Sequence, residues 1–310
     1  MKQILLLSLL FFVTITQAAS FTSSLTGLWN SGPTWGNVLS IPGVDYPAAG
    51  DNATISNGNT VFINGTEICN TLTINSTAST TELAFFTGSL TATSVELISS
   101  GGESKIGNIS GGTITVNTGA LILNQSGAGL CSFNLPLGSV SVTGDITVTN
   151  TAVANTIIDM SGGSASFNFG GNFAGADDLT MTGGSGGSTF TFDGSVLQTT
   201  GTSNTAIVFD NLTMANSHLS GVVLDGALSA ANLGGVLTLA SGVFNDGGFS
   251  IDYTGDISNP GTFINSGTIN LTGSLINSGT FNASGAIDLS GGFTNSGTFT
   301  SSGCNINLQG

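Results

Sequence analysis

Short runs of alternating apolar and polar residues fill most of the chain, and towards its C-terminal end they become periodic. Three matching segments begin 18 residues apart, and these are Asn259-Pro-Gly-Thr-Phe263, Asn277-Ser-Gly-Thr-Phe281 and Asn295-Ser-Gly-Thr-Phe299. Within the first unit, Ile269 and Leu271 flank a polar residue, and the same pattern returns one unit later. An alternation of period two is typical of β-strands with one buried face and one solvated face.

A fixed repeat of this length predicts a solenoid, in which each unit forms one coil of about three short strands. Stacking equal coils would place Phe263, Phe281 and Phe299 in one internal column. Asn259, Asn277 and Asn295 would then form a second column, in which side-chain amides hydrogen-bond from coil to coil.

The same pattern continues upstream with less regular spacing. Short strands are predicted at Leu72–Ile74, Leu90–Ala92, Ile114–Val116, Leu121–Leu123, Val140–Val142 and Ile146–Val148. We therefore expect an all-β fold, a right-handed parallel β-solenoid with coils of about 18–22 residues and about 14 coils in total. A β-sandwich or a chain of small β-domains is the alternative, but it does not explain the constant spacing.

Composition supports β-structure over helix. Charged residues make up only 6% of the chain, whereas 39% of it is hydrophobic, so the chain has a core but a nearly uncharged surface. Its 47 glycines favour turns, and its 19 phenylalanines favour strands.

The first residues predict export. Lys2 precedes an apolar run, Ile4 to Ile15, that is too short to span a bilayer and is followed by small residues. We expect a signal peptide over residues 1–20, no membrane-spanning segment in the mature chain, and a secreted or cell-surface location. Residues 21–310 would form one solenoid, with a cap region at 21–60 and clear repeats at 241–310. The last repeat stops without a capping sequence, so we expect a truncated C-terminus.

The charge balance excludes two classes of partner. The formal net charge is −15, and Lys105 is the only basic residue after Lys2 apart from His218. Nucleic acid and anionic membranes both require clusters of Lys or Arg, so neither is an expected partner.

The opening segment carries a set of motifs: Trp29-Asn-Ser-Gly-Pro-Thr-Trp35, Tyr46-Pro-Ala-Ala-Gly-Asp51 and then strand repeats. It resembles the start of secreted β-helical repeat proteins of the Bacteroidetes type, a loose class of surface and adhesin-like proteins. The resemblance implies a bacterial surface protein. From the residues themselves, Trp29 and Trp35 are expected to cover the open end of the first coil, and a sugar-stacking platform is the alternative.

Candidate catalytic residues are few and scattered. Asp177 and Asp178 are adjacent, so on a strand they would point to opposite faces, and we interpret them as a solvated turn. His218 lies in a turn-like sequence without a nucleophile motif. Cys69, Cys131 and Cys304 are far apart and odd in number, which favours free, buried thiols over a disulfide framework, although one disulfide is possible. No cofactor or metal site is expected.

Function is therefore expected to be non-catalytic, that of a structural or adhesive protein presenting a neutral Thr/Ser/Asn surface to polysaccharides or other cell surfaces. A polysaccharide-degrading scaffold is the alternative, and ice binding is a lesser one. The binding face is predicted from three Thr-x-Thr pairs expected to stack on neighbouring coils, namely Thr71, Thr73, Thr91, Thr93, Thr113 and Thr115.

Overall fold

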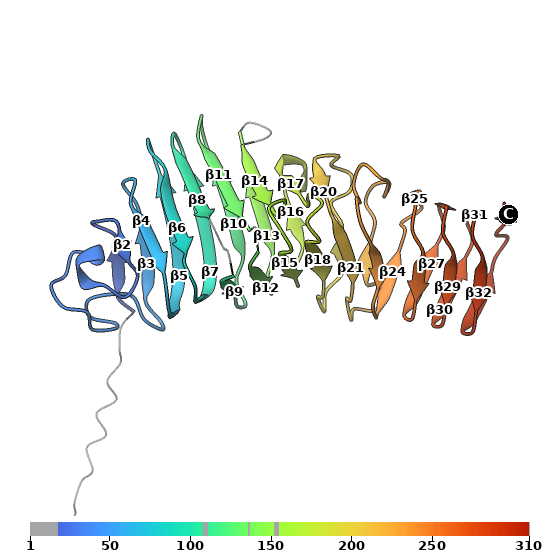
Figure 1. Ribbon diagram of the computed structural model, residues 1–310, viewed down its shortest axis with the longest axis horizontal. Helices are drawn as coiled ribbons and strands as arrows, with labels where there is room; N and C mark the ends of the chain where they lie inside the picture. Colours follow the sequence, from blue (N-terminus) through green and yellow to red (C-terminus); the bar gives the residue numbers. More distant parts are fainter. Residues whose placement is uncertain (1–17, 108–110, 136, 152–154, 310) are drawn as a thin grey trace, which may run out of the picture.

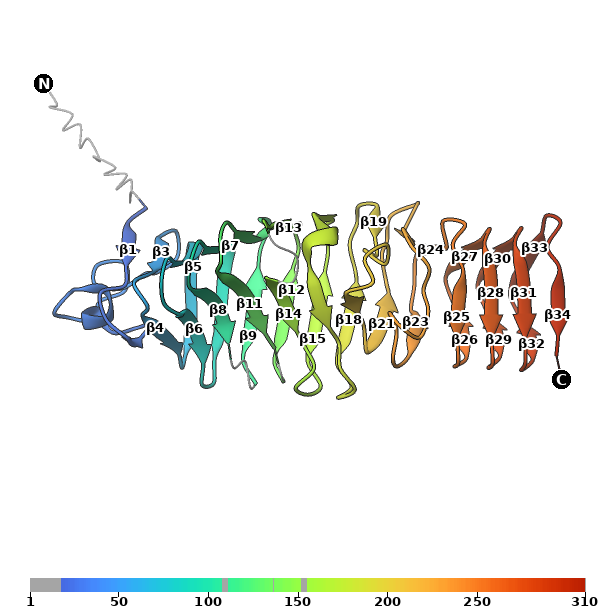
Figure 2. The same cartoon turned by 90° about the horizontal axis from the view of Figure 1, so that it is seen from above.

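The computed structural model describes residues 18–107, 111–135, 137–151 and 155–309. These residues form a rod of stacked parallel strands, with the N-terminal and C-terminal segments at opposite ends (Figures 1 and 2). They make about 11 turns of a β-solenoid and contain no α-helix. The predicted parallel β-solenoid is thus confirmed.

Two long parallel sheets form the N-terminal two thirds of the rod. Sheet I contains β1 (Ser20–Thr22), β3 (Asn52–Ile55), β5 (Thr66–Ser76), β7 (Ser89–Ser99), β9 (Thr113–Val116), β10 (Leu121–Gln125), β12 (Ser139–Val142), β13 (Ile146–Thr149), β15 (Ser166–Phe169), β16 (Phe173–Ala174), β18 (Thr189–Phe192), β21 (Asn211–Met214) and β23 (Leu237–Leu239). Sheet II contains β2 (Gly27–Leu28), β4 (Thr60–Ile63), β6 (Thr81–Phe85), β8 (Glu103–Gly107), β11 (Leu130–Asn134), β14 (Thr156–Asp159), β17 (Thr180–Thr182) and β20 (Ile207–Val208).

Three smaller parallel sheets continue the rod to its C-terminal end. Sheet III contains β19 (Gln198–Thr199), β22 (Val222–Val223), β24 (Val243–Asn245), β27 (Thr262–Asn265), β30 (Thr280–Ala283) and β33 (Thr298–Ser301). Sheet IV contains β25 (Ile251–Tyr253), β28 (Thr268–Leu271), β31 (Ala286–Leu289) and β34 (Ile306–Leu308). Sheet V contains β26 (Ile257–Asn259), β29 (Leu275–Asn277) and β32 (Phe293–Asn295). The described residues also form two short 3₁₀ helices, η1 (Gly32–Trp35) and η2 (Ala176–Asp178).

The core follows from the alternation along each strand, because every second side chain points inward and meets its register partner in the next coil. The predicted aromatic column is present. The ring centroids of Phe263 and Phe281 are 4.9 Å apart, and those of Phe281 and Phe299 are 5.5 Å apart. The buried residues form one hydrophobic cluster that runs from Phe21 to Leu289.

The predicted asparagine ladder is present as well. The Asn259 amide donates to Asn277 Oδ1 at 2.8 Å, and the Asn277 amide donates to Asn295 Oδ1 at 2.6 Å. Each of the two amides also donates to a backbone carbonyl, at Thr280 and at Thr298 respectively, both at 2.9 Å. The ladder thus ties neighbouring coils through the interior, where an unpaired amide would be costly.

Coil length differs from the expectation of 18–22 residues. It is 18 residues where Thr262 pairs with Thr280, but 27 where Ser139 pairs with Ser166. Strand pairing fixes only the strands, and the turns between them lie on the surface and tolerate insertions. The longer middle coils explain why the described part of the chain makes about 11 turns and not the expected 14.

The segment between β1 and β3 lies at the N-terminal end of the rod (Figure 1). Trp29 and Trp35 are both buried there, with ring centroids 5.2 Å apart in an edge-to-face arrangement. The Trp35 indole N–H donates to the Trp29 carbonyl at 2.6 Å, and the Trp29 indole N–H donates to the Pro47 carbonyl at 3.3 Å. Buried rings cannot serve as a sugar platform, so these two residues act as the expected cap.

Most of the expected signal peptide lies outside the described residues. Ser20, which was placed at its last position, already pairs with Asn52 in sheet I.

Candidate binding surfaces

Two neighbouring columns of polar side chains run along the outer face of sheet I, and we call them together the hydroxyl face. One column contains Ser89, Thr113, Ser139, Ser166, Thr189 and Asn211, and the other contains Thr91, Thr115, Ser141, Asn168, Thr191 and Thr213. Consecutive members of each column are register partners on neighbouring coils, and all are exposed or half-buried. Between the columns, every intervening residue is buried, as Ile114 and Phe167 are.

The hydroxyl face has a regular geometry. Neighbouring coils of a parallel sheet are about 4.8 Å apart, and residues two apart on a strand are separated by about 7 Å. Hydroxyls both donate and accept hydrogen bonds, and one pair already does so along a column, where Ser139 Oγ donates to Thr113 Oγ1 at 3.1 Å. The result is a lattice of uncharged donors and acceptors along six consecutive coils.

Only part of the predicted threonine set lies on this face. Thr91 pairs with Thr115, and Thr113 pairs with Ser89. Thr71 and Thr73 instead belong to other columns of sheet I, between Asn52 and Thr54 on one side and Ser94 and Glu96 on the other.

The predicted stacking of the three Thr-x-Thr pairs on neighbouring coils was therefore wrong, because Thr91 lies against Thr115 and not Thr113, and neither Thr71 nor Thr73 shares their columns. The coil between β5 and β7 is 23 residues long, so Thr91 faces Ile68 and not Thr71. Thr93 lies at a junction, because β7 pairs with β9 up to Ala92 and with β10 from Val95 onward. The face continues instead through serine and asparagine positions that a search for Thr-x-Thr does not find.

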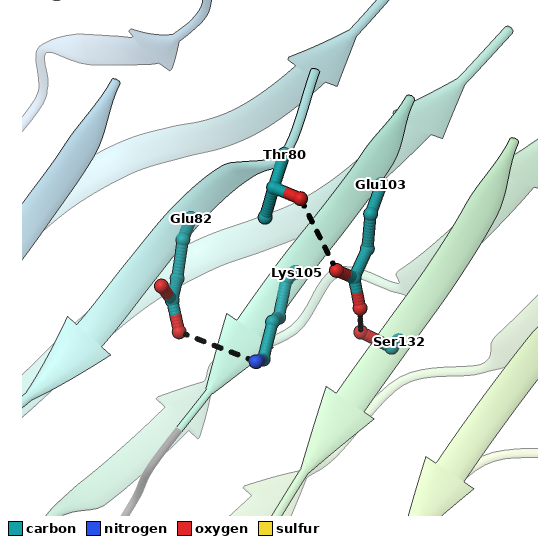
Figure 3. Close-up of polar contacts among 5 residues, drawn as sticks. All are labelled: Thr80, Glu82, Glu103, Lys105 and Ser132. Carbon is teal, nitrogen blue, oxygen red and sulfur yellow. Dashed lines mark hydrogen bonds and ion pairs between the residues drawn. The ribbon is translucent and has the colours of Figure 1, made fainter. Parts of the chain in front are cut away.

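A second polar surface lies on sheet II, where side chains from neighbouring strands meet (Figure 3). Lys105 Nζ lies 3.7 Å from Glu82 Oε1, and both residues are register partners on β8 and β6. Next to this pair, Glu103 accepts hydrogen bonds from Ser132 Oγ at 2.7 Å and Thr80 Oγ1 at 3.4 Å. Lys105, which this surface holds, is the only Lys or Arg side chain among the described residues.

A third surface is a groove of about 530 Å³ over sheet IV. Its floor carries Asp252, Asn270 and Asp288, which are register partners on three consecutive coils. The Asn270 amide donates to Asp252 Oδ1. The two aspartates are thus two coil steps apart, about 10 Å along the rod. Sequence reasoning missed this groove, although the 18-residue repeat places both aspartates beside Asn270 in one column.

The catalytic candidates considered from the sequence remain apart. Asp177 and Asp178 lie in η2, where Asp177 is exposed, and the Asp178 carbonyl accepts a hydrogen bond from the Asn150 amide at 3.3 Å. His218 lies in a turn, where its Nδ1 accepts from the Ser220 amide at 3.1 Å. In the part of the chain that the structure describes, no three His, Cys, Asp or Glu side chains are grouped as a metal site requires.

All three cysteines are free thiols, and Cys69 and Cys131 are buried. Burial raises the pKa of each of these two to about 12. As to membranes, none of the helices described is both long enough and apolar enough to cross one.

Comparison with family models, with curated proteins and with solved structures found no match to this chain.

Proposed function

We propose that this chain is a secreted or cell-surface adhesive repeat protein that binds polysaccharide without cleaving it. The observation that supports this proposal is the hydroxyl face, an uninterrupted pair of neutral polar columns along sheet I. A polysaccharide is itself a periodic array of hydroxyls, so it can form many weak hydrogen bonds with such a face at once. The overall affinity rises with the number of such contacts that form at the same time.

The test is retention of the purified protein on insoluble polysaccharides, with product release measured in parallel. Replacing Thr91 and Thr115 with valine removes two neighbouring hydroxyls and keeps the β-branched shape. We expect retention to weaken about tenfold, the effect of about 1.4 kcal/mol from two lost hydrogen bonds.

The matched control is the same double change at Thr262 and Thr280, which are register partners on sheet III. It should leave retention unchanged. Equal weakening by both pairs, or no retention by the unmodified protein, would contradict the proposal.

Ice binding is a second candidate, and the same face favours it because hydroxyls in a repeating two-column lattice can order water. Thermal hysteresis that disappears in the Thr91/Thr115 double variant, without any polysaccharide retention by the unmodified protein, would favour ice over glycans.

Polysaccharide hydrolysis is a third candidate, and the groove over sheet IV favours it. Asp252 and Asp288 are two coil steps apart, about 10 Å along the rod, and inverting glycosidases hold their two carboxyl groups about 6.5–9.5 Å apart. Release of sugar products that stops in Asp252→Asn or Asp288→Asn would establish this function instead.

A further inference from the structure

A stacked aromatic pair, one ring half-buried and the other exposed, lies on the outer face of sheet II. Phe62 on β4 and Phe86, which directly follows β6, are stacked with ring centroids 4.8 Å apart and planes only 3° from parallel. Phe86 is 57% exposed, whereas its neighbour Phe85 is 1% exposed. The sequence explains this contrast, since two consecutive phenylalanines on a strand path must point to opposite faces.

The aromatic pair and the ion pair share one face. Phe62, Ala84 and Gly107 are in register on three consecutive strands, and Glu82 and Lys105 are register partners two residues earlier on β6 and β8, so they lie on the same side of the sheet. A Cβ atom at Gly107 would lie 2.3 Å from Glu82 Oε1 and 2.6 Å from Lys105 Cε. The Glu82 and Lys105 side chains therefore extend over Gly107, towards the aromatic pair, and along β6 Ala84 is the outward-facing residue between Glu82 and Phe86.

We propose that these four side chains, Phe62, Phe86, Glu82 and Lys105, form a sugar subsite, which we call the aromatic patch. The apolar face of one pyranose ring would pack against the exposed face of Phe86. Its hydroxyls would donate to the Glu82 carboxylate and accept from the Lys105 ammonium. The inference rests on the proposed function, and it adds a second contact point on a different sheet from the hydroxyl face.

The surrounding charge selects the class of sugar. Lys105 is already paired with Glu82, and Glu103 lies on the same strand two residues away. With a net charge of −15 on the chain, an acidic sugar would be repelled. The patch therefore fits a neutral hexopyranose, the repeating unit of an uncharged polysaccharide.

A purely structural role for the aromatic pair makes a different prediction. If Phe86 served only to hold β4 against β6, its loss would lower thermal stability and leave sugar binding unaffected. The exposure of more than half of the Phe86 side chain argues against this role, since a ring that only stabilises coil stacking gains most when both of its faces are covered.

The experiment measures binding of neutral hexaoses of glucose, mannose and N-acetylglucosamine by calorimetry, with an oligoguluronate as the acidic probe. We expect a neutral hexaose to bind, Phe86→Ala to weaken it at least about tenfold, and Phe86→Tyr to bind as the unmodified protein does. Lys105→Gln should weaken binding less than Phe86→Ala. The acidic probe should not bind.

Phe249→Ala is the matched control, because Phe249 is also a partly exposed phenylalanine, at 39%. Equal binding by the unmodified protein and Phe86→Ala, or equal losses in Phe86→Ala and Phe249→Ala, would overturn the aromatic patch.

The two proposals can fail separately. Polysaccharide retention that depends on Thr91 and Thr115 but not on Phe86 would leave the proposed function standing and refute the patch. Hexaose binding that persists in the Thr91/Thr115 double variant and is lost in Phe86→Ala would support the patch by itself. If neither polysaccharide nor hexaose binds, both proposals fail.

Discussion

At the scale of single residues, the interior of each coil tolerates little change, because every inward side chain is packed between its partners above and below. Phe281 is an example. It is fully buried, with Phe263 on one side and Phe299 on the other. Its neighbour Asn282 points outward and is half-buried. These two adjacent positions should therefore differ sharply in the substitutions that they tolerate.

We expect Phe281→Asp to be severely destabilising, by more than about 4 kcal/mol, since it places an unpaired charge in an apolar column. Asn282→Asp, which introduces the same charge one residue away on the outer face, should change stability by less than about 0.5 kcal/mol. Urea denaturation followed by circular dichroism measures both. Similar midpoints for the two variants would contradict the aromatic column.

The thiols should differ in reactivity. Only the thiolate is nucleophilic, and pKa values of about 12 keep Cys69 and Cys131 protonated at neutral pH, while Cys304 is partly exposed. A disulfide reagent at about pH 8 should therefore label Cys304 rapidly in the folded protein and all three cysteines in denaturant. Cys304→Ser should abolish the rapid reaction, and fast labelling that persists in that variant would show that a buried thiol is accessible.

Glu67 is an inward-facing acid. It is 7% exposed, and burial raises the pKa of its carboxyl group. A folded-state pKa above the unfolded value means that stability is greatest at low pH and is lost as pH rises through the folded pKa, because the buried group must then ionise. Glu67→Gln should remove this cost. Its melting temperature should exceed that of the unmodified protein by more at about pH 7 than at about pH 4, and the opposite trend would show that the carboxylate is stabilised.

At the scale of the repeating element, hydrogen-bonded side-chain columns hold the coils in register. The buried Asp246 carboxylate accepts from the Asn265 amide at 2.7 Å, from Ser266 Oγ at 3.0 Å and from the Ser266 backbone at 2.9 Å. Asn265 then continues the column, but its register partner in the next coil is Ala283. The buried Asn265 Oδ1 atom consequently has no hydrogen-bond partner among the described residues.

We expect Ala283→Asn to stabilise the protein by about 1 kcal/mol, because its amide can donate to Asn265 Oδ1 and extend the column. Both residues also line a surface hollow of about 200 Å³, into which neighbouring outward-facing side chains can shift. Ala283→Leu is the control of similar size without a donor. Equal stabilisation by leucine, measured by thermal denaturation, would attribute the gain to packing alone.

The internal columns could be predicted from the sequence where the repeat length is constant, but not where the repeat length varies. The spacing of 18 between Phe263, Phe281 and Phe299 fixes both the coil and the inward face, so the aromatic and asparagine columns could be predicted. Upstream, coil length depends on surface turns that leave no regular pattern in the sequence. The register of Thr71 against Thr91, and with it the hydroxyl face and the aromatic patch, could be established only from the structure.

At the scale of the whole molecule, the rod is an acidic body with almost no compensating positive charge. The formal net charge is −15 at neutral pH, and Lys105 is engaged with Glu82. Repulsion among like charges opposes the folded state, and salt screens it. Added salt should therefore stabilise this protein, unlike one held together by ion pairs.

We expect the melting temperature at about pH 7 to rise by a few degrees between about 0.01 M and about 0.15 M NaCl, as the Debye length falls from about 30 Å to about 8 Å. At about pH 4, near the sequence pI of 4.1, the same change of salt should have little effect because many carboxylates are neutral. Destabilisation by salt at neutral pH would mean that favourable pairs outweigh the repulsion.

The position of the two cap tryptophans determines which part of the rod intrinsic fluorescence reports. The chain's two tryptophans are Trp29 and Trp35, and both belong to the cap at one end of the rod. Intrinsic tryptophan emission therefore reports the loosening of that end alone, whereas far-ultraviolet circular dichroism averages over every coil. If the two signals change at the same denaturant concentration, the rod unfolds as a single cooperative unit. If emission changes at a different concentration, the gap between the two midpoints measures how independently the coils unfold.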